Sequence, residues 1–68
     1  MKVIVNGEEK QFPEKINLAE LLKNLDLPVT RIAVELNQTV VSRATWNEIT
    51  VKENDKIEIV HFVGGGMN

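Results

Sequence analysis

The stretch NLAELLKNL, residues 17–25, decides the fold, because it carries a clear helical repeat of apolar residues. Its leucines recur at positions i, i+3, i+4 and i+7, which is the spacing of one helix face. They are Leu18, Leu21, Leu22 and Leu25. Asn17 is a favourable N-cap, and Glu20 completes a capping-box-like arrangement with it. Pro28 is expected to end the helix. Because the leucines form one apolar face, the helix needs a second layer of structure to bury them.

The segments before this helix are typical of a β-hairpin. Residues 3–5 form a β-branched run that predicts a strand. Asn6-Gly7 follows directly, and this dipeptide supplies the positive φ values of a tight turn. A second strand is expected over residues 10–12, ended by Pro13, which cannot donate to a β-ladder.

The segments after the helix predict further strands. Residues 31–36 alternate between apolar and polar side chains, as a half-buried strand does. The remaining expected elements are a short strand at 40–41, a helical turn at 44–47, a brief edge strand at 49–51 and a last strand at 56–63.

The element order β-β-α-β-β-β predicts an α+β fold in two layers, with a mixed sheet of four to five strands packed on one helix. The first and last strands are expected to be the longest and most apolar, and therefore to lie side by side in the middle of the sheet. That arrangement is the β-grasp. We expect residues 1–63 to form this domain and residues 64–68 to form a flexible glycine tail.

The composition excludes several classes of protein. With 68 residues, 43% of them hydrophobic and 26% charged, the chain is typical of a single soluble domain. It has no cysteine for a disulfide and a single histidine, which cannot make a zinc site alone. A net charge of −2 argues against a nucleic-acid partner. No apolar run is long enough for a membrane span or a signal peptide, so we expect a cytoplasmic protein.

The glycine run Gly64-Gly65-Gly66 is the strongest functional signal. A thread of glycines can enter a narrow channel in which any Cβ would clash, so that an enzyme reaches a carboxylate at its tip. Glycines at a chain end are also typical of an unstructured terminus without a function.

The last strand carries a second signal. Continued alternation places Val60 and Phe62 on the sheet face away from the helix, where the fold does not need them. Ile4 is expected on the same outward face. These three residues predict an apolar docking patch beside the tail. A β-bulge or a slipped register would instead bury Phe62.

Candidate catalytic residues do not combine into a site. His61 is expected on the helix-facing side as a packing or hydrogen-bonding residue, and Trp46 is expected to cover the core. Glu48, Glu53 and Asp55 lack metal-ligand spacing and are expected to be solvated. No nucleophile and base are placed together, so we expect a protein that is not an enzyme and binds no cofactor or metal itself.

Residues 57–66, IEIVHFVGGG, resemble the C-terminus of the ThiS family, the sulfur carriers of thiamine biosynthesis with a ubiquitin-like β-grasp fold. Residues 32–37, Val40-Val41 and Trp46 are similar to the same family, as are the opening residues 3–7 and the leucine-rich helix. The resemblance therefore covers nearly the whole chain.

The resemblance implies a function for the tail. An E1-like adenylyltransferase uses ATP to convert the carboxylate of Gly66 to an acyl adenylate, while Gly64 and Gly65 thread its channel. A persulfide from a cysteine desulfurase system displaces AMP and leaves a thiocarboxylate. Thiazole synthase then takes the sulfur for the thiazole ring of thiamine.

Met67-Asn68 depart from the family pattern, which usually stops at the glycines. We expect a processing protease to remove them, because an Asn side chain does not fit a glycine-sized channel. Three alternatives stay open: a molybdopterin-type sulfur carrier, a ubiquitin-like protein modifier, and a β-grasp adaptor that docks through Val60 and Phe62 alone.

Overall fold

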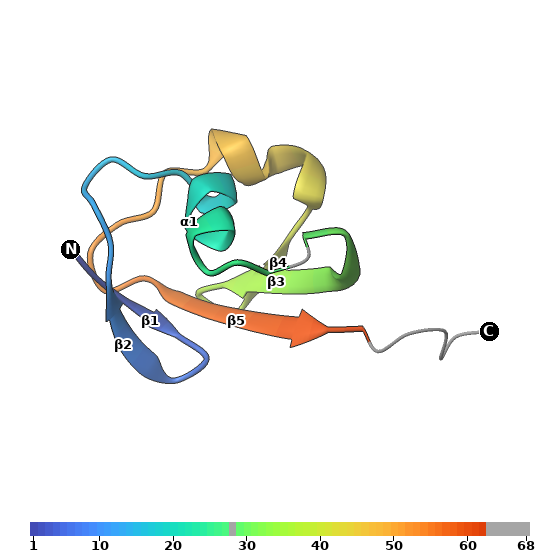
Figure 1. Cartoon of the computed structure of the whole chain (residues 1–68), viewed down its shortest axis with the longest axis horizontal. Coiled ribbons are helices and arrows are strands. Elements are labelled where there is room, and N and C mark those ends of the chain that lie inside the picture. Colours follow the sequence, from blue (N-terminus) through green and yellow to red (C-terminus); the bar gives the residue numbers. More distant parts are fainter. Residues whose placement is uncertain (28, 63–68) are drawn as a thin grey trace.

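The computed structural model describes residues 1–27 and 29–62, and within them a mixed five-stranded sheet carries helix α1 on one face (Figure 1). This confirms the expected two-layer α+β fold. The elements are β1 (Lys2–Val5), β2 (Glu8–Gln11), α1 (Leu18–Asn24), the 3-10 helix η1 (Val29–Arg31), β3 (Ile32–Leu36), β4 (Thr39–Val41), the 3-10 helix η2 (Arg43–Glu48) and β5 (Lys56–His61).

The strand order β2-β1-β5-β3-β4 places the first and last strands side by side, as predicted. β1 and β5 run parallel, whereas β1 is antiparallel to β2, and β5 is antiparallel to β3. The expectation about length is wrong for β1, because its four residues are fewer than the five of β3. Position in the sheet therefore follows from the parallel pairing with β5, not from strand length.

The β1–β2 hairpin turns at Asn6 and Gly7, whose φ angles of 49° and 84° are both positive. Gly7 adopts this conformation without steric cost because it has no Cβ. Since the turn uses only these two residues, Val5 pairs directly with Glu8. The second strand therefore begins at Glu8 and ends at Gln11, earlier than the predicted 10–12.

Helix α1 begins as predicted. The Asn17 side chain accepts from the Glu20 N–H at 2.8 Å, and the Glu20 carboxylate accepts from the Asn17 N–H at 3.0 Å. The helix ends at Asn24, and Asp26 then takes a left-handed φ of 58°. The end therefore comes before Pro28, which lies outside the described residues.

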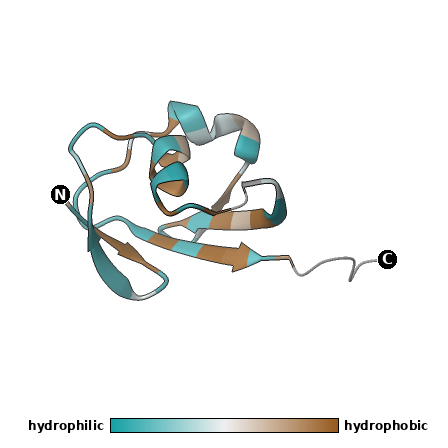
Figure 2. Cartoon of the chain, in the orientation of Figure 1, coloured by the Kyte–Doolittle hydropathy of each residue, from teal (hydrophilic) through white to brown (hydrophobic). Residues whose placement is uncertain are grey.

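The core lies between the sheet and α1, and Figure 2 shows its hydrophobic strands beside the hydrophilic edge strand β2. Leu18, Leu21 and Leu22 are fully buried. Trp46, from η2, is also buried, and its indole N–H donates to the Val41 carbonyl at 3.2 Å. The predicted helical turn and the covering role of Trp46 are confirmed.

Two predicted strands differ in extent. Residues 49–51 form no strand of the sheet: Thr50 makes an isolated bridge to Asn17, held by backbone bonds on either side. These bonds connect the segment to the start of α1 instead of to a strand of the sheet. The last strand ends at His61, and Val63, its predicted end, lies outside the described residues.

Candidate functional site

The sheet face opposite α1 carries the exposed apolar end of β5. Val60 pairs with Ala33, and Glu58 pairs with Glu35, in the antiparallel register of β5 and β3. Alternation from Ile57, which is fully buried, places Val60 on the opposite, open face. Val60 and Phe62 are each 57% exposed. The fold leaves both side chains without a covering layer.

Ile4 shares this open face but does not join the pair. It lies opposite Lys56 in the parallel register of β1 and β5, so four residues of β5 separate its level from that of Val60. At about 3.3 Å per residue, this separation exceeds ~10 Å. Ile4 is also half-buried, whereas Val60 is exposed. The structure thus places Ile4 apart from the other two predicted patch residues.

Val40 is an exposed apolar residue that sequence reasoning missed. It is 70% exposed and lies opposite Glu35 in the hairpin of β3 and β4. That register puts Val40 on the open face together with Glu35 and Val60. The signal in the sequence is the doublet Val40-Val41, of which only one residue can face the core in a strand. Val40 lies level with Glu58 and is separated from β5 by Glu35 of β3, so we call only Val60 and Phe62 the open-face patch.

The end of β1 is tied to β5 through a side chain. The Asn6 N–H donates to the Ile57 carbonyl at 2.8 Å, and the Asn6 Oδ1 accepts from the Ile59 N–H at 2.7 Å. The chain then turns into β2. Figure 1 shows β5 continuing past the end of this hairpin, toward the C-terminal side of the molecule.

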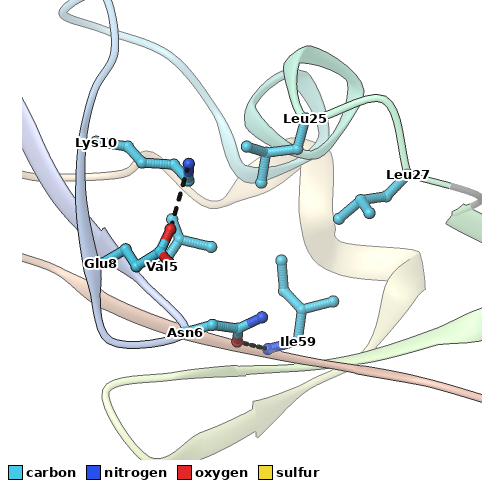
Figure 3. A pocket seen from close by; sticks show the side chains of 7 residues that line it. All are labelled: Val5, Asn6, Glu8, Lys10, Leu25, Leu27 and Ile59. Carbon is cyan, nitrogen blue, oxygen red and sulfur yellow. Dashed lines mark hydrogen bonds and ion pairs between the residues drawn. The ribbon is translucent and has the colours of Figure 1, made fainter.

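A pocket of about 350 Å³ lies on the helix-facing side of the same junction. Figure 3 shows Leu25, Leu27 and Ile59 turned toward one space, with Asn6 beside Ile59. Val5 completes the apolar lining, and the ion pair of Glu8 and Lys10, 3.7 Å long, completes the wall. The Glu8 and Lys10 side chains are 77% and 42% exposed. This lining offers an apolar floor with a solvated charged wall and no pair of groups suited to acid–base chemistry.

His61 differs from its expected role. Its register with Ile32 puts it on the helix-facing side, as predicted, but its side chain is exposed. Within residues 1–27 and 29–62 the imidazole has no hydrogen-bond partner. The expected packing or hydrogen-bonding role is therefore wrong, because β5 reaches beyond the residues that cover the core.

Two of the acidic residues, Glu53 and Asp55, accept hydrogen bonds that hold loop segments in place. Asp55 accepts from the Lys52 N–H at 2.8 Å and from the Asn37 side chain at 3.0 Å. Glu53 accepts from the Lys2 N–H at 3.2 Å, so these two carboxylates are hydrogen-bonded rather than merely solvated. Among the residues that the structure describes, His, Asp and Glu form no group of three able to hold a metal ion. In the same part of the chain, helices are too short and polar to cross a membrane.

The predicted tail residues Gly64, Gly65 and Gly66 lie outside the described residues, as do Met67 and Asn68, together with the predicted domain boundary after Val63. The structure describes the residues that precede them in the sequence. The described chain runs to Phe62, whose N–H donates to the Arg31 carbonyl at 2.8 Å. In the sequence, only Val63 separates Phe62 from the glycine run.

Comparison with known proteins points in one direction. The model of the ThiS family matches residues 3–66. A thiazole synthase from Magnetococcus marinus is 41% identical over the whole chain, which spans only 21% of that relative's length. The sulfur carrier protein ThiS of Bacillus subtilis is 32% identical over 91% of this chain and 96% of its own.

A solved structure agrees with these matches. The crystal structure of the thiamine biosynthesis protein ThiS from Geobacter metallireducens superposes with a TM-score of 0.85 at 36% identity. The similarity covers 97% of this chain and all of that one. The whole of the described fold, and not only the region around the last strand, is thus shared with that protein.

Proposed function

This chain belongs to the ThiS family, and on that premise we propose that it carries sulfur for the thiazole ring of thiamine and is not itself an enzyme. The observation that carries the proposal is the match to ThiS of Bacillus subtilis across 96% of that protein. The match covers nearly the full length of that sulfur carrier, so the relative contains no additional region that could form a separate catalytic domain.

Gly66 is the proposed point of attachment. Its carboxylate attacks the α-phosphate of ATP in an E1-like adenylyltransferase, which releases pyrophosphate and leaves an acyl adenylate. A persulfide, supplied by a cysteine desulfurase system, displaces AMP, and cleavage of the S–S bond by a second thiol leaves a thiocarboxylate. Gly64 and Gly65 admit the tail to the active site because they have no Cβ. ATP is a substrate of the partner, and this chain holds no cofactor in the proposal.

Thiazole synthase is the proposed acceptor of the sulfur. The relative from Magnetococcus marinus bears that name and contains a region similar to this whole chain, which supports a functional link between the two activities. The same names favour thiazole synthase over a molybdopterin synthase. Because adenylation consumes ATP, we place these reactions in the cytoplasm.

The open-face patch supports docking beside the tail. Val60 and Phe62 are exposed apolar residues immediately before the glycine run, and such residues commonly mark interaction sites. In the proposal they contact the partner while Gly66 reaches its active site. Ile4, on β1 beside the start of β5, lies outside this contact.

Residues 67–68 enter the proposal as a segment to be removed. With Met67 and Asn68 present, the carbonyl of Gly66 is part of a peptide bond, so Gly66 has no free carboxylate that could react with ATP. We propose that a processing protease cleaves after Gly66.

Adenylation assays test this proposal. Chains stopped at Gly66, at Gly65 and at Asn68 are incubated with the adenylyltransferase of the same organism, and ATP–pyrophosphate exchange is measured. We expect exchange with the first chain only. Equal exchange with the chain ending at Asn68 would contradict the processing step, and no exchange with any of them would contradict the carrier function. Ladders of higher mass on a denaturing gel would instead support a protein modifier.

A further inference from the structure

We propose that the end of β5, from Ile59 to Phe62, is a strand-addition site, at which an extended segment of thiazole synthase pairs with the edge that β1 leaves open. The identity of the partner rests on the proposed function. The site itself rests on the hydrogen bonding of the sheet.

Alternate residues of β5 direct their backbone groups to opposite neighbours. The Asn37 N–H donates to the Lys56 carbonyl at 2.7 Å, and the Phe62 N–H donates to the Arg31 carbonyl at 2.8 Å. The backbone N–H and carbonyl groups of the even-numbered residues of β5 therefore point toward β3. Odd-numbered residues face β1, as shown by the bond from the Asn6 N–H to the Ile57 carbonyl at 2.8 Å.

This second ladder stops at Asn6. Its Oδ1 accepts from the Ile59 N–H in place of a backbone carbonyl, and the chain then turns at Gly7 into β2. Three groups of β5 beyond this point face the β1 side: the Ile59 carbonyl and the N–H and carbonyl of His61. None of the three has a partner in residues 1–27 and 29–62. They form an acceptor, a donor and an acceptor in line with β1, a pattern that an extended backbone complements.

The edge lacks the side chains that usually block strand addition. Exposed edges are commonly protected by lysine, proline or charged side chains. The sequence here is Ile59-Val60-His61-Phe62, which carries none of these. The outer strand β2, by contrast, reads EEKQ. The part of β5 that is left open is thus also the part suited to pairing.

Apolar surface flanks the edge on both faces of the sheet. Val60 and Phe62 lie exposed on the open face. On the helix-facing side, Ile59, Leu25 and Leu27 line the 350 Å³ pocket (Figure 3). A strand added about 4.8 Å from β5 would place the side chain opposite Val60 on the open face and the one opposite Ile59 at the pocket. The partner segment is therefore expected to be apolar toward the open face and to place one apolar side chain on the pocket floor, beside the Glu8–Lys10 ion pair.

The site lies next to the tail, which argues for the enzyme that receives the tail as the occupant. A protein that takes Gly66 into its active site has its surface within a few residues of Phe62. Pairing along β5 would fix the direction in which the glycines leave the sheet. Thiazole synthase is the candidate because its name is borne by a relative that contains a region similar to this chain.

His61→Pro tests the pairing with a matched control. Proline removes the N–H of His61, which faces away from β3, so no hydrogen-bond donor of the β3–β5 ladder is lost. His61→Ala removes the same side chain but keeps the N–H. We measure the affinity of the thiazole synthase from the same organism for each variant by calorimetry. We expect affinity about tenfold weaker for His61→Pro than for His61→Ala. Equal affinities would overturn the proposal.

Amide hydrogen exchange tests it without any substitution. The His61 amide is expected to exchange at least about tenfold more slowly in the saturated complex with thiazole synthase, whereas the Glu58 amide faces β3 and serves as the reference. Unchanged exchange at His61 would overturn the proposal. Protection in the free chain that grows with concentration would identify a second copy as the occupant, and protection by the adenylyltransferase alone would identify that enzyme instead. A thiazole synthase that binds the chain without protecting His61 would leave the carrier function intact.

Discussion

The Asn6 Oδ1 accepts a 2.7 Å hydrogen bond from the N–H of Ile59, 53 residues further along the chain. This side-chain bond takes the place of a backbone hydrogen bond between β1 and β5. The residue that makes the first turn therefore also holds the last strand. Since β5 leads directly into the glycine run, this bond links the hairpin at one end of the chain to the position from which the tail departs.

Asn6→Gly isolates the contribution of this bond. Glycine accepts the φ of 49° at Asn6 without strain, so in the folded state the variant loses only the acceptor for Ile59, while the unfolded chain gains backbone freedom. We expect a loss of about 1 kcal/mol in the free energy of unfolding, measured by urea denaturation. Asn6→Asp keeps an acceptor and should retain most of the stability. A glycine variant as stable as the parent would show that the bond contributes nothing.

Leu22→Ala tests the leucine face of α1. Leu22 is fully buried, and truncation of such a residue leaves a cavity that costs about 2–5 kcal/mol. In a domain of this size that loss is a large part of the total stability. Lys23→Ala, on the exposed side of the same helix, serves as the control and should change the melting temperature little. An unchanged melting temperature for Leu22→Ala would contradict its place in the core.

Phe62→Ala separates docking from folding. Phe62 is 57% exposed, so its truncation should change the free energy of unfolding by less than about 0.5 kcal/mol. We expect weaker binding to the adenylyltransferase, by about tenfold, because an apolar contact beside the tail is lost. Ile4→Ala, on β1 beside the start of β5, should bind as the parent does. The reverse order of effects would move the docking surface to β1.

Gly65→Val tests the channel. The residue follows β5 and the described domain, so we expect the melting temperature to stay within error of the parent. Two methyl groups on a new Cβ should block entry to a glycine-sized channel and abolish adenylation of a chain stopped at Gly66. Gly65→Ala should give an intermediate rate. A fall in melting temperature would mean that Gly65 packs against the domain, and adenylation at the parental rate would contradict the channel.

Local signals predicted much of the fold. The capping box at Asn17 and the turn at Asn6-Gly7 both appear as expected, because each is determined by residues that are neighbours in the sequence. The end of α1 was wrong, since Asp26 takes a left-handed conformation that an L-residue adopts only where its surroundings favour it. Asp is one of the few residues that adopt this conformation, so the residue type at position 26 is a local signal that the prediction from Pro28 did not use.

Register explains what sequence reasoning missed at the candidate site. Alternation predicted the outward faces of Val60 and Phe62, but not the separation of Ile4 from them, which depends on the pairing of Ile4 with Lys56. Val40 was missed because its face follows from the β3–β4 register. His61 is exposed because β5 extends beyond the layer that covers it, a matter of strand length relative to the helix.

Intact-mass spectrometry tests whether Gly66 becomes a thiocarboxylate. A chain stopped at Gly66 is incubated with the adenylyltransferase, ATP, cysteine and the desulfurase system of the same organism. We expect a product in which one carboxylate oxygen of Gly66 is replaced by sulfur, formed only when ATP is present. An unchanged mass, under conditions in which the same enzymes thiolate the sulfur carrier ThiS of Bacillus subtilis, would contradict it.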